Sequence, residues 1–421
     1  MTLKTTSALL IGLLTFGLAG SLSFAQPAAT NNYVTREEYE KLLKEVQGLQ
    51  TQLKAAEEKR AEPSAETEQV LDEMEKKLKE VKSLASAVQP GLTKPLITGY
   101  AFAGYTDAHD EVSSINAGFN PIFLWKQGER LFFEGELEVE FEEGEVEVAL
   151  EYAHASYVLN DYITLGAGKF LAPNNYFMER LHPAWINKLP DKPILMDGDT
   201  RLQAHTQLGL QVRGAAPLGP AKVGYALYVS PGPSIRTSGA SAGTLRFNNF
   251  EVNNNKAFGG RVGFFPIPQL EIGYGFEVAE VGNAGSAFAE VGAVSHALDL
   301  NYVRDSRLLH GTVDLRSQIV WLSIDNPNVA PLNFQNDRVG GYVQLAYRPS
   351  QIDVPILKNL EAVARFDWLD LPAGAPNNEY TERWTVGLDY WLGASTVLKA
   401  AYEFGNREEL DAFLLQVAMG F

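Results

Sequence analysis

The chain has 421 residues, of which 45% are apolar, 11% aromatic and 21% charged, so it can fold as one large domain or two ordinary ones. Its formal net charge of −17 argues against binding to nucleic acid, because no surplus of basic side chains is available to neutralise phosphates. The absence of cysteine excludes disulfide scaffolds, thiolate metal sites and cysteine nucleophiles.

Residues 1–25 have the features of an export signal peptide. Lys4 precedes a short apolar run, and Ser23 and Ala25 place small residues before a cleavage site at Gln26. The run is shorter than the roughly 20 residues that a membrane-spanning helix needs. We therefore expect an exported mature protein, with an uncleaved membrane anchor as the alternative.

Residues 26–90 are predicted to form a periplasmic coiled-coil stalk. Apolar residues alternate at spacings of three and four over residues 39–56 and, after a break that holds Pro63, over residues 71–85. This heptad periodicity with charged flanks is typical of a coiled coil. The favoured interpretation is a parallel oligomerisation stalk. The alternative is an amphipathic helix that folds back on its own chain.

From residue 91 to the last residue, the apolar period changes from 3.5 to 2. Over residues 131–142, apolar residues alternate with Phe132 and five glutamates, which gives a strand with one apolar and one largely acidic face. Sixteen such segments, each about ten residues long, have the length of tilted strands that cross a bilayer. They lie near residues 95–105, 116–125, 131–142, 145–158, 161–170, 205–215, 220–230, 256–265, 269–280, 294–304, 307–321, 338–348, 359–369, 382–392, 395–405 and 411–421.

The pattern predicts an all-β domain over residues 91–421: a 16-stranded antiparallel transmembrane β-barrel, preceded by the α-helical coiled-coil segment. Short and long connections tend to alternate along the chain, as in barrels with short periplasmic turns and long external loops. The terminal aromatic residue Phe421 resembles the signal read by the bacterial barrel-assembly machinery. A soluble β-sandwich is the alternative, and it would have to hide its apolar face inside.

Three short motifs lie where the fifth predicted strand passes into a long loop. They are GKFLAP at residues 168–173, ERLHP at residues 179–183 and NKLP at residues 187–190. This passage resembles that of bacterial outer-membrane porins of the phosphate-selective O and P family. With the preceding coiled coil, the sixteen strands and the terminal Phe421, the resemblance covers essentially the whole mature chain.

The resemblance implies a homotrimer of barrels in the outer membrane, each with a third external loop that folds inward to narrow the pore. Residues 171–204 form the third and longest external connection, so they are the constriction candidate by position and length as well. The family's phosphate-selective members line their channels with arginines and lysines. Here residues 91–421 carry most of the negative charge and show no regularly spaced arginines, so anion selectivity is not carried over.

Charged residues within the predicted strands are expected to face a water-filled lumen, because the outer face meets lipid. Acidic residues on the third and fourth strands would lie across the ring from Arg316 and Arg348 on the eleventh and twelfth. Such a transverse field favours charged, hydrated solutes, and the excess of acid indicates a weak preference for cations. The predicted pore-lining residues are Glu134, Glu136, Glu138, Glu140, Glu147, Glu151, Arg213, Arg261, Arg316, Arg348, Arg365 and Lys399.

The predicted constriction loop is nearly balanced in charge. Its basic residues are Arg180, His182, Lys188, Lys192 and Arg201. The six histidines of the chain form no HExxH motif or other close ligand pair, so neither a metal site nor a cofactor is expected. No serine lies in a G-x-S-x-G motif, and a catalytic role is not expected.

The sequence favours an outer-membrane porin through which small hydrophilic solutes and ions diffuse passively. Two other functions stay open. One is a channel specific for phosphate or another oxyanion. The other is a structural barrel whose coiled coil tethers the outer membrane to the cell wall.

Overall fold

The structure is a computed structural model, and it describes residues 95–142, 144–376 and 378–421. The predicted signal peptide (1–25) and coiled-coil stalk (26–90) lie outside the described residues. Among the described residues, no helix is long and apolar enough to cross a membrane.

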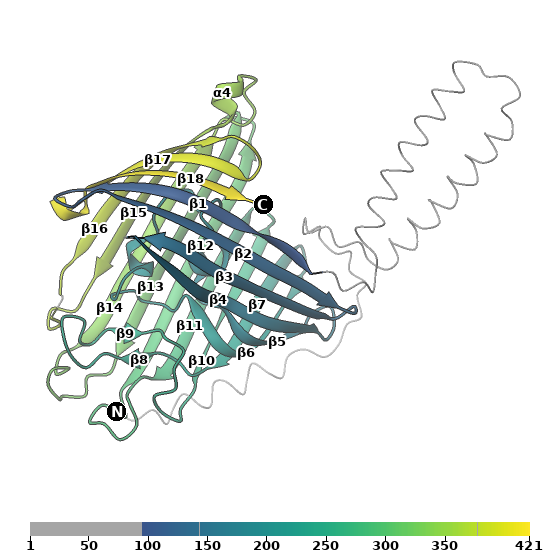
Figure 1. Ribbon diagram of the computed structural model, residues 1–421. Coiled ribbons are helices and arrows are strands. Elements are labelled where there is room, and N and C mark those ends of the chain that lie inside the picture. Colours follow the sequence, from purple (N-terminus) through teal and green to yellow (C-terminus); the bar gives the residue numbers. More distant parts are fainter. Residues whose placement is uncertain (1–94, 143, 377) are drawn as a thin grey trace, which may run out of the picture. The chain divides into compact units, whose positions relative to one another are not determined.

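Sixteen strands close into one antiparallel barrel, as predicted, with each strand paired to its sequence neighbours and β1 paired to β18 (Figure 1). Each of the sixteen predicted segments overlaps one of these strands. The strands are β1 (Leu96–Ala108), β2 (Ser114–Gln127), β3 (Leu131–Glu142), β4 (Glu145–Val158), β5 (Thr164–Leu171), β6 (Thr206–Leu218), β7 (Ala221–Ser230), β10 (Ala257–Ile267), β11 (Leu270–Glu280), β12 (Gly292–Ser306), β13 (Gly311–Ile324), β14 (Asn336–Arg348), β15 (Leu360–Asp370), β16 (Thr381–Trp391), β17 (Thr396–Gly405) and β18 (Ala412–Gly420).

The barrel closes at the C-terminus of the chain. The amide of Phe421 donates to the carbonyl of Gly99 (3.0 Å), and the amide of Gly99 donates back to the carbonyl of Phe421 (3.2 Å). The Phe421 ring stacks on Phe119 of β2, with ring centroids 5.7 Å apart. The terminal residue therefore joins β18 to β1 and removes the last free sheet edge.

Apolar side chains cover the outside of the barrel. On β18, Phe413, Leu415, Val417 and Met419 point outward and are about half-exposed, as the alternation predicts. The inward residues of β18, however, include the buried Leu414. An apolar interior is unexpected for a wall that faces only water, and it shows that something packs against the wall from inside.

Short elements that the sequence pattern did not predict lie between the strands. The connection after β7 contains a two-stranded sheet of β8 (Ser234–Ile235) and β9 (Leu245–Arg246). The connection after β14 contains the single-turn helix α4 (Pro355–Lys358), and η3 (Glu408–Leu410) precedes β18. Helix α3 (Tyr176–Arg180) and the 3₁₀ turn η2 (Ile194–Met196) both lie in the predicted constriction loop.

A β-bulge in β4 changes which residues face inward. Glu136 pairs with Tyr152 and Leu137 pairs with Leu150, which leaves Glu151 as an extra residue. Outward apolar residues are therefore even-numbered before the bulge and odd-numbered after it, because one extra residue reverses the alternation. As a result, Tyr152 and His154 face inward, which strict alternation from Glu147 did not predict.

Candidate permeation path and constriction loop

Residues 171–204, here called the constriction loop, pack against inward-facing residues of the barrel wall. Helix α3 begins at its N-cap Asn175, whose side chain accepts from the amide of Met178 (3.2 Å) and donates to the carbonyl of Ala204 (3.1 Å). The cap thus also ties the start of the loop to its end, and it satisfies an otherwise unpaired helix amide.

One face of the loop is apolar. It packs against buried apolar residues on the inner face of β10–β15, and together they form a hydrophobic core. Phe177 packs edge-on against Tyr342 of β14, with ring centroids 5.9 Å apart. Met178 and Leu195 belong to the same cluster of buried residues as Val320 of β13. Burial of these side chains stabilises the loop inside the barrel, so this half of the wall is covered rather than open.

A buried ionic cluster holds the middle of the loop. The carboxylate of Asp191 pairs with Arg365 of β15 and with Arg383 of β16, the latter at 2.7 Å, while Arg365 also pairs with Asp367 at 2.9 Å. Burial alone would raise the pKa of Asp191, but the two guanidinium groups hold it below its usual value. Removal of either an acidic or a basic side chain from such a cluster would leave an uncompensated buried charge.

Two lysine contacts anchor the part of the loop that lies between α3 and Asp191. Lys399 of β17 donates to the carbonyls of Ala184 (2.5 Å) and Asn187 (2.7 Å). Lys188 pairs with Glu361 of β15 at 2.8 Å. Both lysines therefore bind the loop to the wall.

The structure corrects the predicted lining on this side of the barrel. Arg261, Arg365 and Lys399 are only 5%, 0% and 3% exposed, because the loop and neighbouring carboxylates cover them. Arg316 pairs with Asp314 on its own strand at 2.6 Å, and Arg348 binds the carbonyl of Lys358 at the turn after β14. The sequence analysis placed these two arginines directly across the lumen from β3 and β4. It did not take into account the loop that packs over this wall.

The opposite wall, formed by β3 and β4, is different. Glu134, Glu138 and Glu151 are partly exposed and Glu147 is exposed. Within the described part of the chain, none of these four carboxylates forms an ion pair with a lysine or arginine; Glu140 also lies on this wall and is partly exposed. Glu136 is an exception to the prediction, since it is buried at 1% exposure.

The constriction loop and β6 bring basic groups near this acidic wall. Lys192 acts electrostatically on Glu151, and Arg201 does the same. Arg180 and Arg213, which share the carboxylate of Glu179, keep 41% and 40% of their side chains exposed. On β3–β4 the exposed charges are thus carboxylates. The loop and β6 carry the exposed bases Arg180 and Arg213 together with the exposed carboxylates Asp197 and Asp199.

Two histidines are neutral at pH 7, His182 of the constriction loop and His205 directly after it. Burial lowers the pKa of His182 to about 3 and the pKa of His205 to about 4. One ring nitrogen of each contacts a backbone carbonyl, Met178 for His182 (2.5 Å) and Met196 for His205 (2.7 Å). In the described residues, no three side chains of His, Cys, Asp or Glu gather in a metal-binding arrangement.

The sequence reasoning missed the acidic partners of the buried bases, namely Asp191, Asp367, Glu271, Glu361 and Asp299. The signal was present, because the wall acids occupy the same inward positions as the predicted bases. What alternation does not reveal is that two inward charges on neighbouring strands neutralise each other.

Comparison with known proteins supports the fold. No family model matches the chain, and no curated protein matches it either. Among solved structures, an OmpF complex with daunomycin from Salmonella typhi has a TM-score of 0.54 at 12% identity over 78% of this chain and 98% of that one. The fold is that of a porin. The anion-selective porin from Comamonas acidovorans gives 0.50 at 12% identity, over 78% of this chain and all of that one.

Proposed function

We propose that the protein is an outer-membrane porin, a water-filled channel through which small hydrophilic solutes and ions diffuse passively. The observation that carries this proposal is the division of surfaces in a closed barrel. Apolar side chains face outward, where they match a lipid bilayer. On the inner face, Glu134, Glu138, Glu147 and Glu151 of β3–β4 form no ion pair with a lysine or arginine of the described chain and stay partly or fully exposed.

The path for solutes in this proposal runs between the β3–β4 wall and the constriction loop. Glu134, Glu138 and Glu147 line one side, and Arg180 and Lys192 the other. The resulting transverse field orients dipolar and zwitterionic solutes. Among the described residues, these three acids form no ion pair with a lysine or arginine, whereas Arg180 pairs with Glu179 and Glu271. This difference supports a weak preference for cations.

The test is single-channel conductance of the purified protein in a planar bilayer, with two matched variants on β4. Ala149 pairs with the inward Glu138, and Ala155 pairs with the outward Phe133. Ala149→Trp should lower the conductance because its ring enters the path, whereas Ala155→Trp should leave it unchanged. A barrel that passes almost no current would contradict the porin and favour the structural anchor.

A channel for phosphate or another oxyanion is the second candidate, and it would extend the resemblance to phosphate-selective porins. The exposed guanidinium groups of Arg180 and Arg213 favour it, since such groups bind oxyanions well. Saturable block of chloride current by millimolar phosphate would support this candidate. Indifference to phosphate would leave the general porin.

The remaining proposals concern export and assembly. We propose export by the signal peptide, insertion by the barrel-assembly machinery through Phe421, and a homotrimer joined in part by the coiled coil in the periplasm. Cross-linking of the full chain should yield trimers, and deletion of residues 31–89 should reduce them. Undiminished trimers after the deletion would contradict a role for the coiled coil in assembly.

A further inference from the structure

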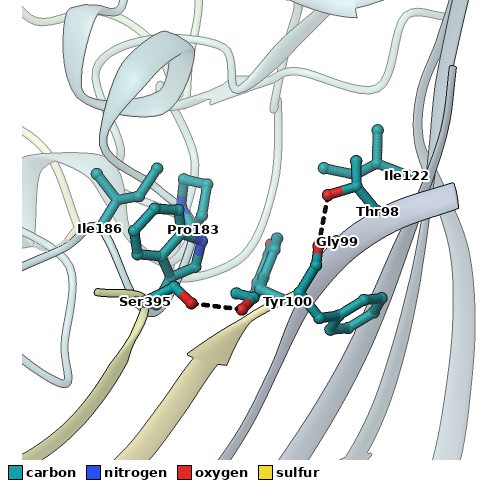
Figure 2. Close-up of a pocket in the computed structure, with 10 residues that line it drawn as sticks. Thr98, Gly99, Tyr100, Ile122, Pro183, Ile186 and Ser395 are labelled. Carbon is teal, nitrogen blue, oxygen red and sulfur yellow. Dashed lines mark hydrogen bonds between the residues drawn. The ribbon is translucent and has the colours of Figure 1, made fainter. Parts of the chain in front are cut away.

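Two cavities of the described structure differ in their lining. One, of about 390 Å³, lies inside the barrel between Pro183 and Ile186 of the constriction loop and Thr98 and Ile122 of the wall (Figure 2). No charged side chain of the described chain lines it. The other, of about 420 Å³, is bordered by residues of β12–β15 that include charged side chains. The second cavity therefore offers charged groups to a ligand, whereas the first does not.

The second cavity is a groove on the outward face of the barrel, here called the outer groove. Its lining includes His296, Trp321, Val339 and Asp370, which pair directly with one another across β12, β13, β14 and β15 and so form one row. The row faces outward, because Leu322, the neighbour of Trp321, points into the core, while Trp321 itself is 39% exposed. The small Val339 lies between the larger Trp321 and Asp370, which leaves a depression there.

The outer groove lies near the strand ends that carry the long connections. β13 ends at Ile324 and β14 begins at Asn336, a few residues from the row that contains Trp321. One row closer to the middle of the strands, the indole of Trp368 lies over Gly341, where a Cβ would come within 2.4 Å of the ring. Outward-facing tryptophans near strand ends are typical of the boundary between hydrocarbon and lipid head groups. The groove therefore opens towards the bilayer at the level of the head groups.

Two carboxylates of the outer groove lack a basic partner. In the described part of the chain, neither Asp337 nor Asp370 forms an ion pair with a lysine or arginine. Asp337 accepts a hydrogen bond from the hydroxyl of Ser323 (2.5 Å). The guanidinium group of Arg338 is turned away from the groove, and it donates to the carbonyl of Gly243 (3.0 Å). A positively charged head group would therefore complement the groove.

We propose that the outer groove binds one phospholipid whose head group carries a primary ammonium, of the phosphatidylethanolamine type. The ammonium lies between the carboxylates of Asp337 and Asp370, to which it donates charge-assisted hydrogen bonds. The ring of Trp321 beside it attracts a cation through its π system. An acyl chain follows the apolar floor at Val339. A choline head group has no N–H to donate, and a glycerol head group has no positive charge, so neither complements the carboxylates as well.

The other end of the outer groove suits the phosphate of the same lipid. The hydroxyl of Tyr274 lies 2.7 Å from Nδ1 of His296. When this hydroxyl donates to Nδ1, the proton of the neutral ring is on Nε2, which can then donate to a phosphate oxygen. His296 is two strands, or about 10 Å, from Asp337. The two side chains and the ethanolamine arm between phosphate and ammonium together span this separation.

The test is native mass spectrometry of the full-length protein in detergent, titrated with phosphatidylethanolamine, phosphatidylcholine and phosphatidylglycerol that have the same acyl chains. One phosphatidylethanolamine per barrel should bind about tenfold more tightly than either of the other lipids, because it alone brings an ammonium with N–H donors. Equal affinity for the three lipids, or a preference for either of the other two, would overturn the proposal. This measurement needs no variant and so does not depend on the folding of one.

Variants then locate the lipid. D337N/D370N should bind phosphatidylethanolamine about tenfold more weakly. V339W, which fills the groove, should weaken binding as well. E280Q/D325N is the matched control, because Glu280 and Asp325 are exposed carboxylates at the same end of the barrel that do not line the groove, and it should bind like the wild type. Binding that survives both D337N/D370N and V339W in folded barrels, or that is lost equally in E280Q/D325N, would contradict the assignment.

The lipid site goes beyond the proposed channel and can be tested separately from it. The substituted side chains lie on the outward face, so the single-channel conductance of D337N/D370N should equal that of the wild type. Loss of the lipid preference would leave the porin unaffected, and a barrel without current would leave the lipid site unaffected.

Discussion

The inner faces of two opposite walls of the barrel differ in how their charges are used. On β10–β16, charged residues such as Arg261 and Arg365 are buried in ion pairs beneath the constriction loop and next to apolar residues. On β3–β4, carboxylates such as Glu134 and Glu147 have no lysine or arginine partner in the described chain and stay partly or fully exposed. The same residue types thus serve to hold the loop on one wall and to set the electrostatic field on the other.

The largest effect expected from this comparison is on stability. R365A removes the cation between Asp191 and Asp367, which leaves two buried carboxylates less compensated, and it should lower the free energy of unfolding by about 3–5 kcal/mol. Denaturation of the folded barrel in urea measures this loss.

R213A is the matched control on the exposed side of the loop. Arg213 pairs with Glu179 while 40% of its side chain is exposed, so solvent screens the pair and the cost should be at most about 1 kcal/mol. Equal losses from R365A and R213A would contradict the distinction between the buried and the exposed ion pairs that hold the loop.

A smaller effect is expected from pH. The pKa of His205 is about 4 in the folded barrel, against an ordinary value of about 6.5. Between these values the unfolded chain binds a proton that the folded chain does not, so stability is present above about pH 6.5 and is lost as the pH falls towards 4. The loss is on the order of 3 kcal/mol.

Urea midpoints at pH 7, 5 and 4 measure this dependence. In H205Q the part of the loss that belongs to this residue should disappear, and the midpoint should change less with pH. A variant whose pH dependence equals that of the wild type would show that His205 is not the group responsible.

The smallest effect concerns the start of the constriction loop. N175A removes both the cap of α3 and the hydrogen bond to Ala204, and it should cost about 1–2 kcal/mol of unfolding free energy. The substitution should leave ion selectivity unchanged, because Asn175 is buried away from the exposed charges. A change of selectivity without a loss of stability would contradict a purely structural role for the cap.

The barrel was predictable because each strand shows its own two-residue period, and sixteen weak signals of equal length reinforce one another. Inward positions on β15 and β16 were predictable for the same reason. The burial of Arg365 and Lys399 was not, because it depends on a loop far away in sequence whose Asp191 and backbone carbonyls reach these strands. The bulge at Glu151 was visible in retrospect, since the outward apolar residues of β4 change parity there.

The exposed charge on β3–β4 is the central claim, and the zero-current potential of the protein in a planar bilayer under a KCl gradient tests it most directly. The account predicts a cation-selective potential that shifts towards anions when Glu134, Glu138, Glu147 and Glu151 are changed to glutamine. The control variant changes four exposed carboxylates outside the strands, Asp110, Glu111, Glu408 and Glu409, to the corresponding amides. This variant should shift the zero-current potential much less. An anion-selective wild type, or equal shifts in both variants, would contradict the account.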